Sequence, residues 1–102
     1  MVREAKATME MKQLLWETIL NCKTPEDLEI LFDDLCTYKE VEQMAQRVSS
    51  AKMLKEGKTY AEIIEKTDIS SATLSRVSRC VQRGSGGYSK FVFNDGSVTS
   101  LD

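Results

Sequence analysis

Histidine is absent from the 102 residues, and cysteine occurs only at Cys22, Cys36 and Cys80. The three thiols are far apart in the sequence, and no pair has the short spacing that is typical of metal ligands. The sequence therefore predicts neither a zinc site nor a disulfide framework, and we expect no metal. The spacing favours reduced, mostly buried thiols in a cytosolic protein.

Long apolar runs are also missing from the sequence. No stretch approaches the roughly 18 apolar residues of a membrane-spanning helix, and the first residues lack the pattern of a secretory signal. We therefore expect a soluble, cytoplasmic protein with no membrane contact. A Gly-rich phosphate loop and a nucleophile elbow are absent as well. For that reason an enzyme is not expected.

The charge is distributed unevenly, although the formal net charge is only −2. Residues 1–45 contain 5 Lys and Arg against 10 Asp and Glu, whereas residues 46–90 contain 9 against 4. A basic half on an acidic body fits a protein that presents one face to phosphates, although an ordinary mixed surface is the alternative. One domain of this length buries only about 60–65% of its unfolded surface, which favours a partner chain.

The first predicted helix covers about residues 8–21 and has apolar side chains on more than one side. This apolar surface is wider than the single stripe of a helix on the surface of a monomer. We interpret it as a helix held between two subunits. The alternative is that Trp16 lies at the edge of a monomer core.

The second predicted helix begins at Thr24-Pro25 and runs to about Leu35. Thr24 is a suitable capping residue, and Pro25 occupies the first helical position, where its missing N–H is harmless. Apolar residues of both helices form the expected dimer interface. They are Met11, Leu14, Leu15, Trp16, Ile19, Leu28, Leu31 and Phe32.

A longer third helix is predicted from about Lys39 to Glu56, and Gly57 is placed to end it in a left-handed conformation. Its spacing predicts a buried stripe along one face. The stripe contains Val41, Met44, Ala45, Val48, Ala51 and Leu54.

Residues 59–83 predict two short helices joined by a tight turn. Thr59 and Glu62 have the spacing of a capping box at the start of a helix over 60–66, and Asp68 tolerates a turn conformation. The next helix begins at Ser70 or Ser71 and ends at Arg83. An apolar seam joins the two helices and contains Ile63, Ile64, Ile69, Leu74 and Val77. This arrangement predicts a helix-turn-helix, although a helical hairpin that only packs is the alternative.

Small hydroxyl side chains alternate with arginines along the last of these helices, a pattern that suits a surface lying against DNA. The start of this helix is expected to face base edges through Ser70, Ser71, Ala72 and Ser75. Basic side chains are expected to contact phosphates and to fix the register. These are Lys58, Lys66, Arg79 and Arg83.

The composition changes after Arg83, where Gly84-Ser85-Gly86-Gly87 forms a flexible break. Loose alternation over 88–93 and the turn signal at 94–96 predict a small β-hairpin. A disordered tail is the alternative, because two strands alone are barely stable in water. We therefore divide the chain into a helical domain over 1–83 and a flexible or hairpin tail over 84–102.

Two segments carry a family resemblance, DLCTYKEVEQMAQRVSSAKMLKEGKTYAEI and SATLSRVSR, with a weaker match over LLWETILNCKTPEDLEILFDDL. Together they resemble the Trp repressor superfamily, and most closely its bacterial YerC/YecD group. The resemblance implies an all-α, intertwined homodimer in which the N-terminal helices of one subunit wrap around the other. Each subunit would offer one helix-turn-helix to a two-fold-related site on double-stranded DNA.

The resemblance also implies a ligand site between the third predicted helix and the second helix of the helix-turn-helix. In the Trp repressor this site holds tryptophan, and the matching positions here are Thr37, Arg47, Thr73 and Arg76. Two guanidinium groups and two hydroxyls suit an amino acid or another small anion. Alternatively, the two arginines pair with Glu40, Glu62 or backbone carbonyls.

Val77 stands where the superfamily repressor has a glycine that leaves room for the indole ring. A β-branched side chain there disfavours tryptophan, so another small ligand or no cofactor at all remains open. The sequence therefore predicts a homodimeric DNA-binding transcriptional regulator, expected to be a repressor. The rival interpretation is a protein–protein interaction module of the transcription machinery that keeps the helix-turn-helix shape.

Overall fold

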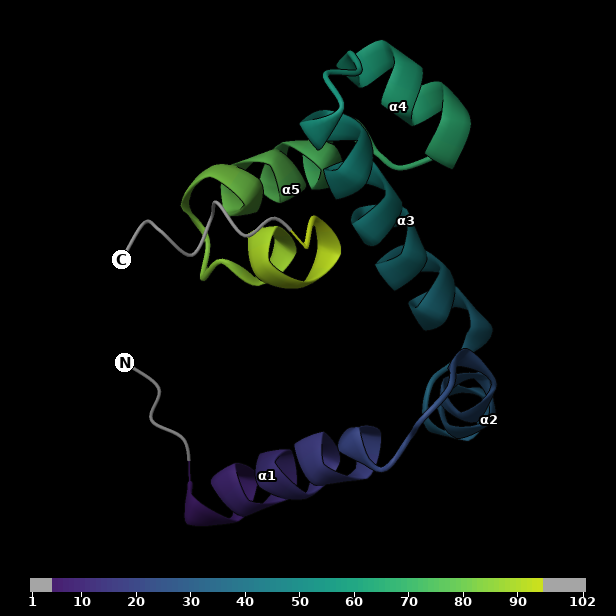
Figure 1. Ribbon diagram of the computed structural model, residues 1–102, viewed down its shortest axis with the longest axis vertical. Coiled ribbons are helices and arrows are strands. Elements are labelled where there is room, and N and C mark those ends of the chain that lie inside the picture. Colours follow the sequence, from purple (N-terminus) through teal and green to yellow (C-terminus); the bar gives the residue numbers. More distant parts are fainter. Residues whose placement is uncertain (1–4, 95–102) are drawn as a thin grey trace. The chain divides into compact units, whose positions relative to one another are not determined.

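The computed structural model describes residues 5–94, and every regular element in that range is helical (Figure 1). The elements are α1 (Lys6–Leu20), α2 (Pro25–Leu35), α3 (Tyr38–Lys55), α4 (Tyr60–Thr67), α5 (Ser71–Arg83) and the π-helical turn η1 (Tyr88–Val92). The predicted all-α class is confirmed. The chain divides into two compact units, residues 1–38 and residues 39–102, and each is described by itself.

The first unit contains α1 and α2, and the predicted start of α2 is confirmed. The Thr24 hydroxyl accepts a hydrogen bond from the Asp27 amide at 3.1 Å, and Pro25 is the first residue of the helix. The Asp27 carboxylate in turn accepts from the Lys23 amide at 2.9 Å. Helix α1 begins at Lys6, earlier than its apolar pattern predicts. The start of α2 is therefore specified by contacts within four residues of sequence.

None of the residues of α1 or α2 is buried in the single chain. Leu14 is 63% exposed and Trp16 is 52% exposed. Side chains of this size normally lie inside a protein or against a partner.

The second unit contains α3, α4, α5 and η1, and its turns follow the local sequence. Gly57 has a φ of +88° directly after α3, as predicted for a left-handed helix stop. The capping box of α4 is present, with the Glu62 carboxylate accepting from the Thr59 amide at 2.8 Å. Asp68 ends α4 with a φ of +65°, a conformation that Asp adopts more readily than most residues. Ser70 then caps α5.

A small core holds the second unit together and confirms the predicted apolar seam. Its buried apolar residues are Ala51, Ile63, Ile69, Leu74 and Val77, with Ile64, Met53, Leu54, Val81, Tyr88 and Phe93 packed against them. These side chains come from α3, α4, α5, the turn between α4 and α5, and the segment around η1. The core therefore fixes α4 and α5 against α3.

The predicted buried stripe of α3 is wrong over most of its length. Ala51 is buried, whereas Val41 is 36% exposed and Val48 is 47% exposed. Met44 and Leu54 are half-buried and Ala45 is exposed. The apolar periodicity is real, but within the second unit only the C-terminal half of α3 has core residues packed against it.

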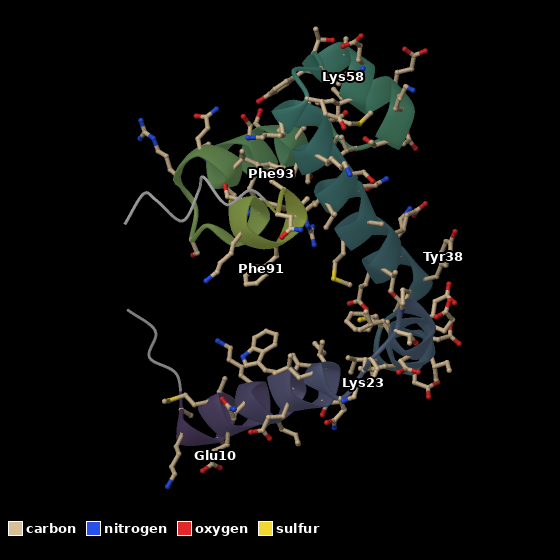
Figure 2. All side chains as sticks on the ribbon, in the orientation of Figure 1. Glu10, Lys23, Tyr38, Lys58, Phe91 and Phe93 are labelled. Atoms are coloured by element: carbon tan, nitrogen blue, oxygen red, sulfur yellow. The ribbon has the colours of Figure 1, made fainter. Side chains whose placement is uncertain are left out.

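The predicted strand over 88–93 is also wrong, because these residues form η1 and its C-cap. Tyr88 and Phe93 pack against the core, and the Phe93 amide donates to the Tyr88 carbonyl at 2.9 Å. Figure 2 shows Phe93 on the inner side of this turn and Phe91 on its outer side. Partial burial of these two aromatic side chains outweighs a weak β alternation. The predicted return strand over 97–99 lies outside the described residues.

Candidate nucleic-acid interface and adjoining pocket

Helix α5 has two chemically different faces. Leu74 and Val77 are buried in the core of the second unit. The exposed residues are Ser71, Ala72, Ser75, Arg76, Arg79, Gln82 and Arg83. The helix contains three arginines and no acidic residue. The apolar face therefore anchors α5, while the opposite face presents small hydroxyls and cations to solvent.

The Ser70 hydroxyl makes two hydrogen bonds to Thr73. It accepts from the Thr73 amide at 3.1 Å and donates to the Thr73 hydroxyl at 2.9 Å. Capping of this kind satisfies an N–H that the first turn of a helix cannot pair internally. Of the predicted base-facing residues, Ser71, Ala72 and Ser75 are the exposed ones that do not cap α5.

The predicted phosphate-contacting lysines flank α4. Lys58 precedes α4 and Lys66 lies in its last turn, and both are exposed. They line one shallow hollow of about 460 Å³ together with Met53, Glu62 and Glu65. The carboxylates of Glu62 and Glu65 reduce the positive potential of this hollow, so α5 carries the stronger cationic face.

The pKa of Glu62 lies below its ordinary value of 4.5. The main cause is the hydrogen bond from the Thr59 backbone, followed by the Thr59 hydroxyl, with smaller contributions from the charges of Lys58 and Lys66. Hydrogen bonds to a carboxylate favour its ionised form. The Glu62 carboxylate therefore acts in capping, and its predicted alternative role of pairing with an arginine stays a prediction.

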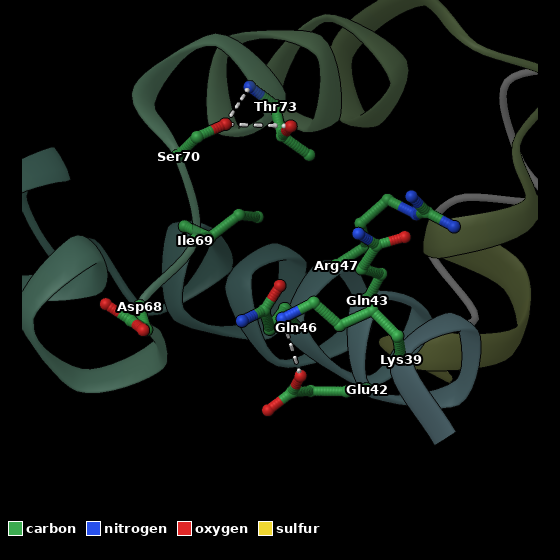
Figure 3. Close-up of a pocket in the computed structure, with 9 residues that line it drawn as sticks. All are labelled: Lys39, Glu42, Gln43, Gln46, Arg47, Asp68, Ile69, Ser70 and Thr73. Carbon is green, nitrogen blue, oxygen red and sulfur yellow. Dashed lines mark hydrogen bonds and ion pairs between the residues drawn. The ribbon is translucent and has the colours of Figure 1, made fainter. Parts of the chain in front are cut away.

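A pocket of about 340 Å³ opens between α3 and the turn that leads into α5 (Figure 3). Arg47 from α3 and Thr73 from α5 both line it, so the structure brings these two predicted ligand residues together. Arg76 does not line this pocket, although it is exposed on α5. Thr37 belongs to the first unit and is exposed.

Val77 is only 1% exposed and belongs to the core rather than to the pocket wall. Its branched side chain contributes to the cluster that contains Ile63 and Leu74. Valine stands here where the superfamily repressor has glycine, and in this chain it therefore also contributes to the packing of the core.

Most of the pocket lining was not predicted from the sequence as part of a site. The further residues are Lys39, Glu42, Gln43, Gln46, Asp68, Ile69 and Ser70. The ion pair between Lys39 and Glu42, at 3.6 Å, lies along this wall. Residues 39, 42, 43, 46 and 47 recur at helical spacing and so share one face of α3. The helical spacing of these polar residues could have indicated that one face of α3 lines a pocket. The spacing does not by itself show which residues lie opposite that face.

Residues 5–94 offer neither a metal-binding cluster nor a membrane span. No three His, Cys, Asp or Glu side chains lie close enough together in this range to hold a metal ion. No helix in the same range is both long and apolar enough to cross a membrane.

Helices α4 and α5, with the turn at 68–70 between them, share one apolar seam and expose a polar, cationic face on α5. Two short helices joined by a tight turn and a shared seam have the form of a helix-turn-helix. The family model of the Trp repressor protein matches residues 10–95 of the chain. The chain therefore belongs to the Trp repressor family, a family of DNA-binding regulators rather than enzymes.

Individual relatives agree with this assignment. The uncharacterized protein YerC of Bacillus subtilis is 46% identical over 74 residues, which cover 72% of this chain and 71% of YerC. A crystal structure of a candidate Trp repressor from Staphylococcus aureus has a TM-score of 0.80 and 38% identity, over 83% of this chain and 85% of that one. A TrpR-like protein from Eubacterium eligens ATCC 27750 has the same TM-score and identity, over 83% and 88% of the two chains.

Proposed function

We propose that the chain is a transcriptional repressor that binds double-stranded DNA as a homodimer through α5. The observation that carries this proposal is the exposed face of α5, where small side chains accompany three arginines without an acidic residue. A helix with this composition can enter the major groove while its cations contact phosphates. The opposite face is buried in the core, which holds the helix in one orientation.

The apolar surface of the first unit supports the homodimer. Eight apolar residues of α1 and α2 are the proposed interface, and none of them is buried in the single chain. A second copy that covered them would also place two helix-turn-helix units, α4 and α5 of each copy, in a symmetric pair. In such a pair the half-sites on DNA lie about 34 Å, or one helical turn, apart.

The two kinds of DNA contact are assigned to different residues. Ser71, Ala72 and Ser75 are proposed to face base edges, where hydroxyls and a methyl group make adaptable contacts. Ser70 caps α5 with its hydroxyl, so it is proposed to lie against the DNA through its backbone. Four basic residues are proposed to bind phosphates, namely Lys58, Lys66, Arg79 and Arg83. They contribute affinity and register rather than sequence preference.

Selection from a randomised DNA duplex pool tests the proposal and does not require a known operator. The expected result is an enriched two-fold-related sequence, bound by a species of twice the 11.5 kDa chain mass in light scattering. Eight phosphate contacts per dimer predict a slope of about −7 in log affinity against log salt concentration. Absence of enrichment together with salt-independent capture of a protein partner would instead establish the rival interaction module.

Arg79→Ala tests the role assigned to a phosphate-contacting residue. Loss of one contact per subunit should weaken binding to all duplexes by a similar factor and make the salt slope shallower by about 2 per dimer. Binding titrations with the enriched duplex and a scrambled one, each over a series of salt concentrations, provide the measurement. A loss confined to one base pair would contradict the assignment and place Arg79 at a base edge.

A small-molecule corepressor stays a separate prediction. The common pocket of Arg47 and Thr73 supports an amino acid or another small anion, although Glu42 and Asp68 also line it and reduce its positive potential. Val77 does not line this pocket, so the expectation that it disfavours tryptophan rests on the family pattern alone. Titration calorimetry with tryptophan and with inorganic phosphate would measure both affinities. Heat on tryptophan addition that Arg47→Ala abolishes would show that Val77 does not exclude the indole ring.

A further inference from the structure

One polar side chain connects α3 with the end of α4. The Gln46 side-chain amide donates to the backbone carbonyl of Thr67 at 3.1 Å, across a separation of 21 residues. Thr67 is the last residue of α4, where carbonyl groups have no partner within the helix. A residue of α3 thus completes the hydrogen bonding at the point where the chain leaves α4.

The same short segment is held by further bonds of Thr67. Its hydroxyl donates to the Ile63 carbonyl at 2.8 Å and accepts from the Ile69 amide at 3.2 Å. Asp68, between them, is in the left-handed conformation and donates its amide to the Ile64 carbonyl at 2.8 Å. These bonds define the shape of the turn, and the bond from Gln46 fixes this shaped turn to α3.

Two hollows adjoin the Gln46 side chain. Gln46 and Asp68 line the 340 Å³ pocket that contains Arg47 and Thr73 (Figure 3). They also line a second hollow of about 240 Å³ on the side of Ser49 and Lys66. Part of the surroundings of the bond is therefore open, although close packing usually fixes the distance between two elements. The buried core holds α4 and α5 through Ile63, Ile69 and Leu74.

We propose that Gln46 is a positioning residue that sets the orientation of the turn and of the first turn of α5 relative to α3. The inference rests on the proposed DNA-binding function, because its consequence is sequence selectivity. The proposed base-facing residues Ser71 and Ala72 begin within four residues of the Thr67 carbonyl. A change of angle at the turn moves these side chains relative to base edges, whereas the phosphate contacts at the far end of α5 tolerate it better.

Gln46→Met tests this role. Methionine keeps the unbranched shape and helix preference of glutamine but cannot donate a hydrogen bond. Gln13→Met is the control, because Gln13 is an exposed residue of the same type that lines neither hollow and bonds to Glu17 of its own helix. The full-length chain is used throughout. Duplex enriched by the wild-type protein and a scrambled duplex of equal length are the two probes.

The expected result is a change in selectivity rather than in general affinity. Gln46→Met should bind the enriched duplex about five- to tenfold more weakly, as expected for loss of one hydrogen bond. Affinity for the scrambled duplex and the salt slope should stay within about twofold of the wild type. A variant that only lost stability would lower both affinities by one factor. Gln13→Met should change neither.

Amide hydrogen exchange gives a readout that does not depend on DNA. Exchange at Asp68 and Ile69 should become about five- to tenfold faster in Gln46→Met, while exchange at Leu74 changes less. Unchanged exchange and an unchanged ratio of the two affinities would overturn the inference. Faster exchange with an unchanged ratio would overturn it as well, because the turn would then be ordered by Gln46 without consequence for recognition. If the wild-type protein enriches no duplex, the proposed function itself fails.

Discussion

The two units of the chain differ in how they bury their apolar side chains. The second unit has a core of five buried apolar residues contributed by α3, α4, α5 and the turn between α4 and α5. The first unit has two regular helices but no buried residue among those described in α1 and α2. Local helix formation is equally successful in both units. The difference shows that a helix boundary can be specified locally although the burial of its apolar face is not.

The contrast continues along α3. Its C-terminal half contributes Ala51 to the core, whereas Tyr38 at its start is 84% exposed. The proposed dimer would cover the exposed apolar side chains of the first unit. A chain of this length has few elements with which to cover the apolar surfaces of both units. The second unit already has its own packed contacts. Substitutions in the two units should consequently differ in whether they affect association or local packing.

The largest effect is expected from Leu14→Glu in α1. A carboxylate without a partner in an apolar interface should weaken dimerisation by about 100-fold or more, because both copies carry the change. Sedimentation equilibrium of the variant provides the measurement. Gln13→Glu is the control, because it adds the same charge at the exposed neighbouring position. Equal dimerisation of Leu14→Glu and the wild type would show that α1 is not part of the interface.

Phe93→Ala should act on the second unit alone. Its ring packs against the core and lies 5.5 Å from the Lys55 ammonium group, so truncation should lower the free energy of unfolding by about 2 kcal/mol. Phe91 is 77% exposed on the same turn and provides the matched control. Phe91→Ala should cost less than about 0.5 kcal/mol. Urea denaturation of both variants measures the difference in the free energy of unfolding. Equal losses would show that Phe93 does not stabilise the core more than Phe91 does.

Ser50→Ala is expected to raise stability. Ser50 is fully buried, and its hydroxyl has no hydrogen-bond partner within the described part of the chain. Removing a buried unpaired hydroxyl should increase the free energy of unfolding by about 1 kcal/mol, and alanine also favours the helix. Ser49→Ala, at an exposed position next to it, should have a smaller effect. A loss of stability in Ser50→Ala would indicate that the hydroxyl has a partner in the assembled protein.

The smallest effect is expected at the capping box of α4. The folded pKa of Glu62 is lowered, so its stabilising contribution is present above its ordinary value of 4.5 and is lost as the pH falls through the folded pKa. Glu62→Gln removes this titration while it keeps the capping-box pattern. The difference in stability between wild type and variant should therefore shrink as the pH falls below 4.5. A difference that stayed constant down to about pH 2 would exclude Glu62 as the titrating group.

Much of the fold could be predicted because its signals are local. Thr24-Pro25, the Thr59–Glu62 capping box and Gly57 each act within four residues, so their geometry follows from neighbouring side chains. The apolar seam between α4 and α5 was also predictable, because residues 63–77 are close in sequence and helical spacing shows which of them share a face.

The errors concern features that depend on distant residues. The strand pattern over 88–93 is weak, and Tyr88 and Phe93 instead pack against the core formed by α3, α4 and α5. The stripe of α3 is apolar throughout, yet its burial depends on what lies opposite. Which residues share a pocket also depends on the tertiary structure, since Arg47 and Thr73 line one pocket that Arg76 does not line, while the ligand site itself stays a prediction.

Helices α1 to α5, the caps of α2 and α4, the apolar seam and the family are evident in the amino-acid sequence, because these features follow from contacts between near neighbours and from a pattern shared with relatives. The hydrogen bond of Gln46 to the end of α4, and the packing of Tyr88 and Phe93 against the core, depend on the tertiary structure. A hydrogen bond or a packed ring between residues far apart in the sequence depends on where the intervening helices place its two ends. Periodicity and local spacing contain no information about that distance.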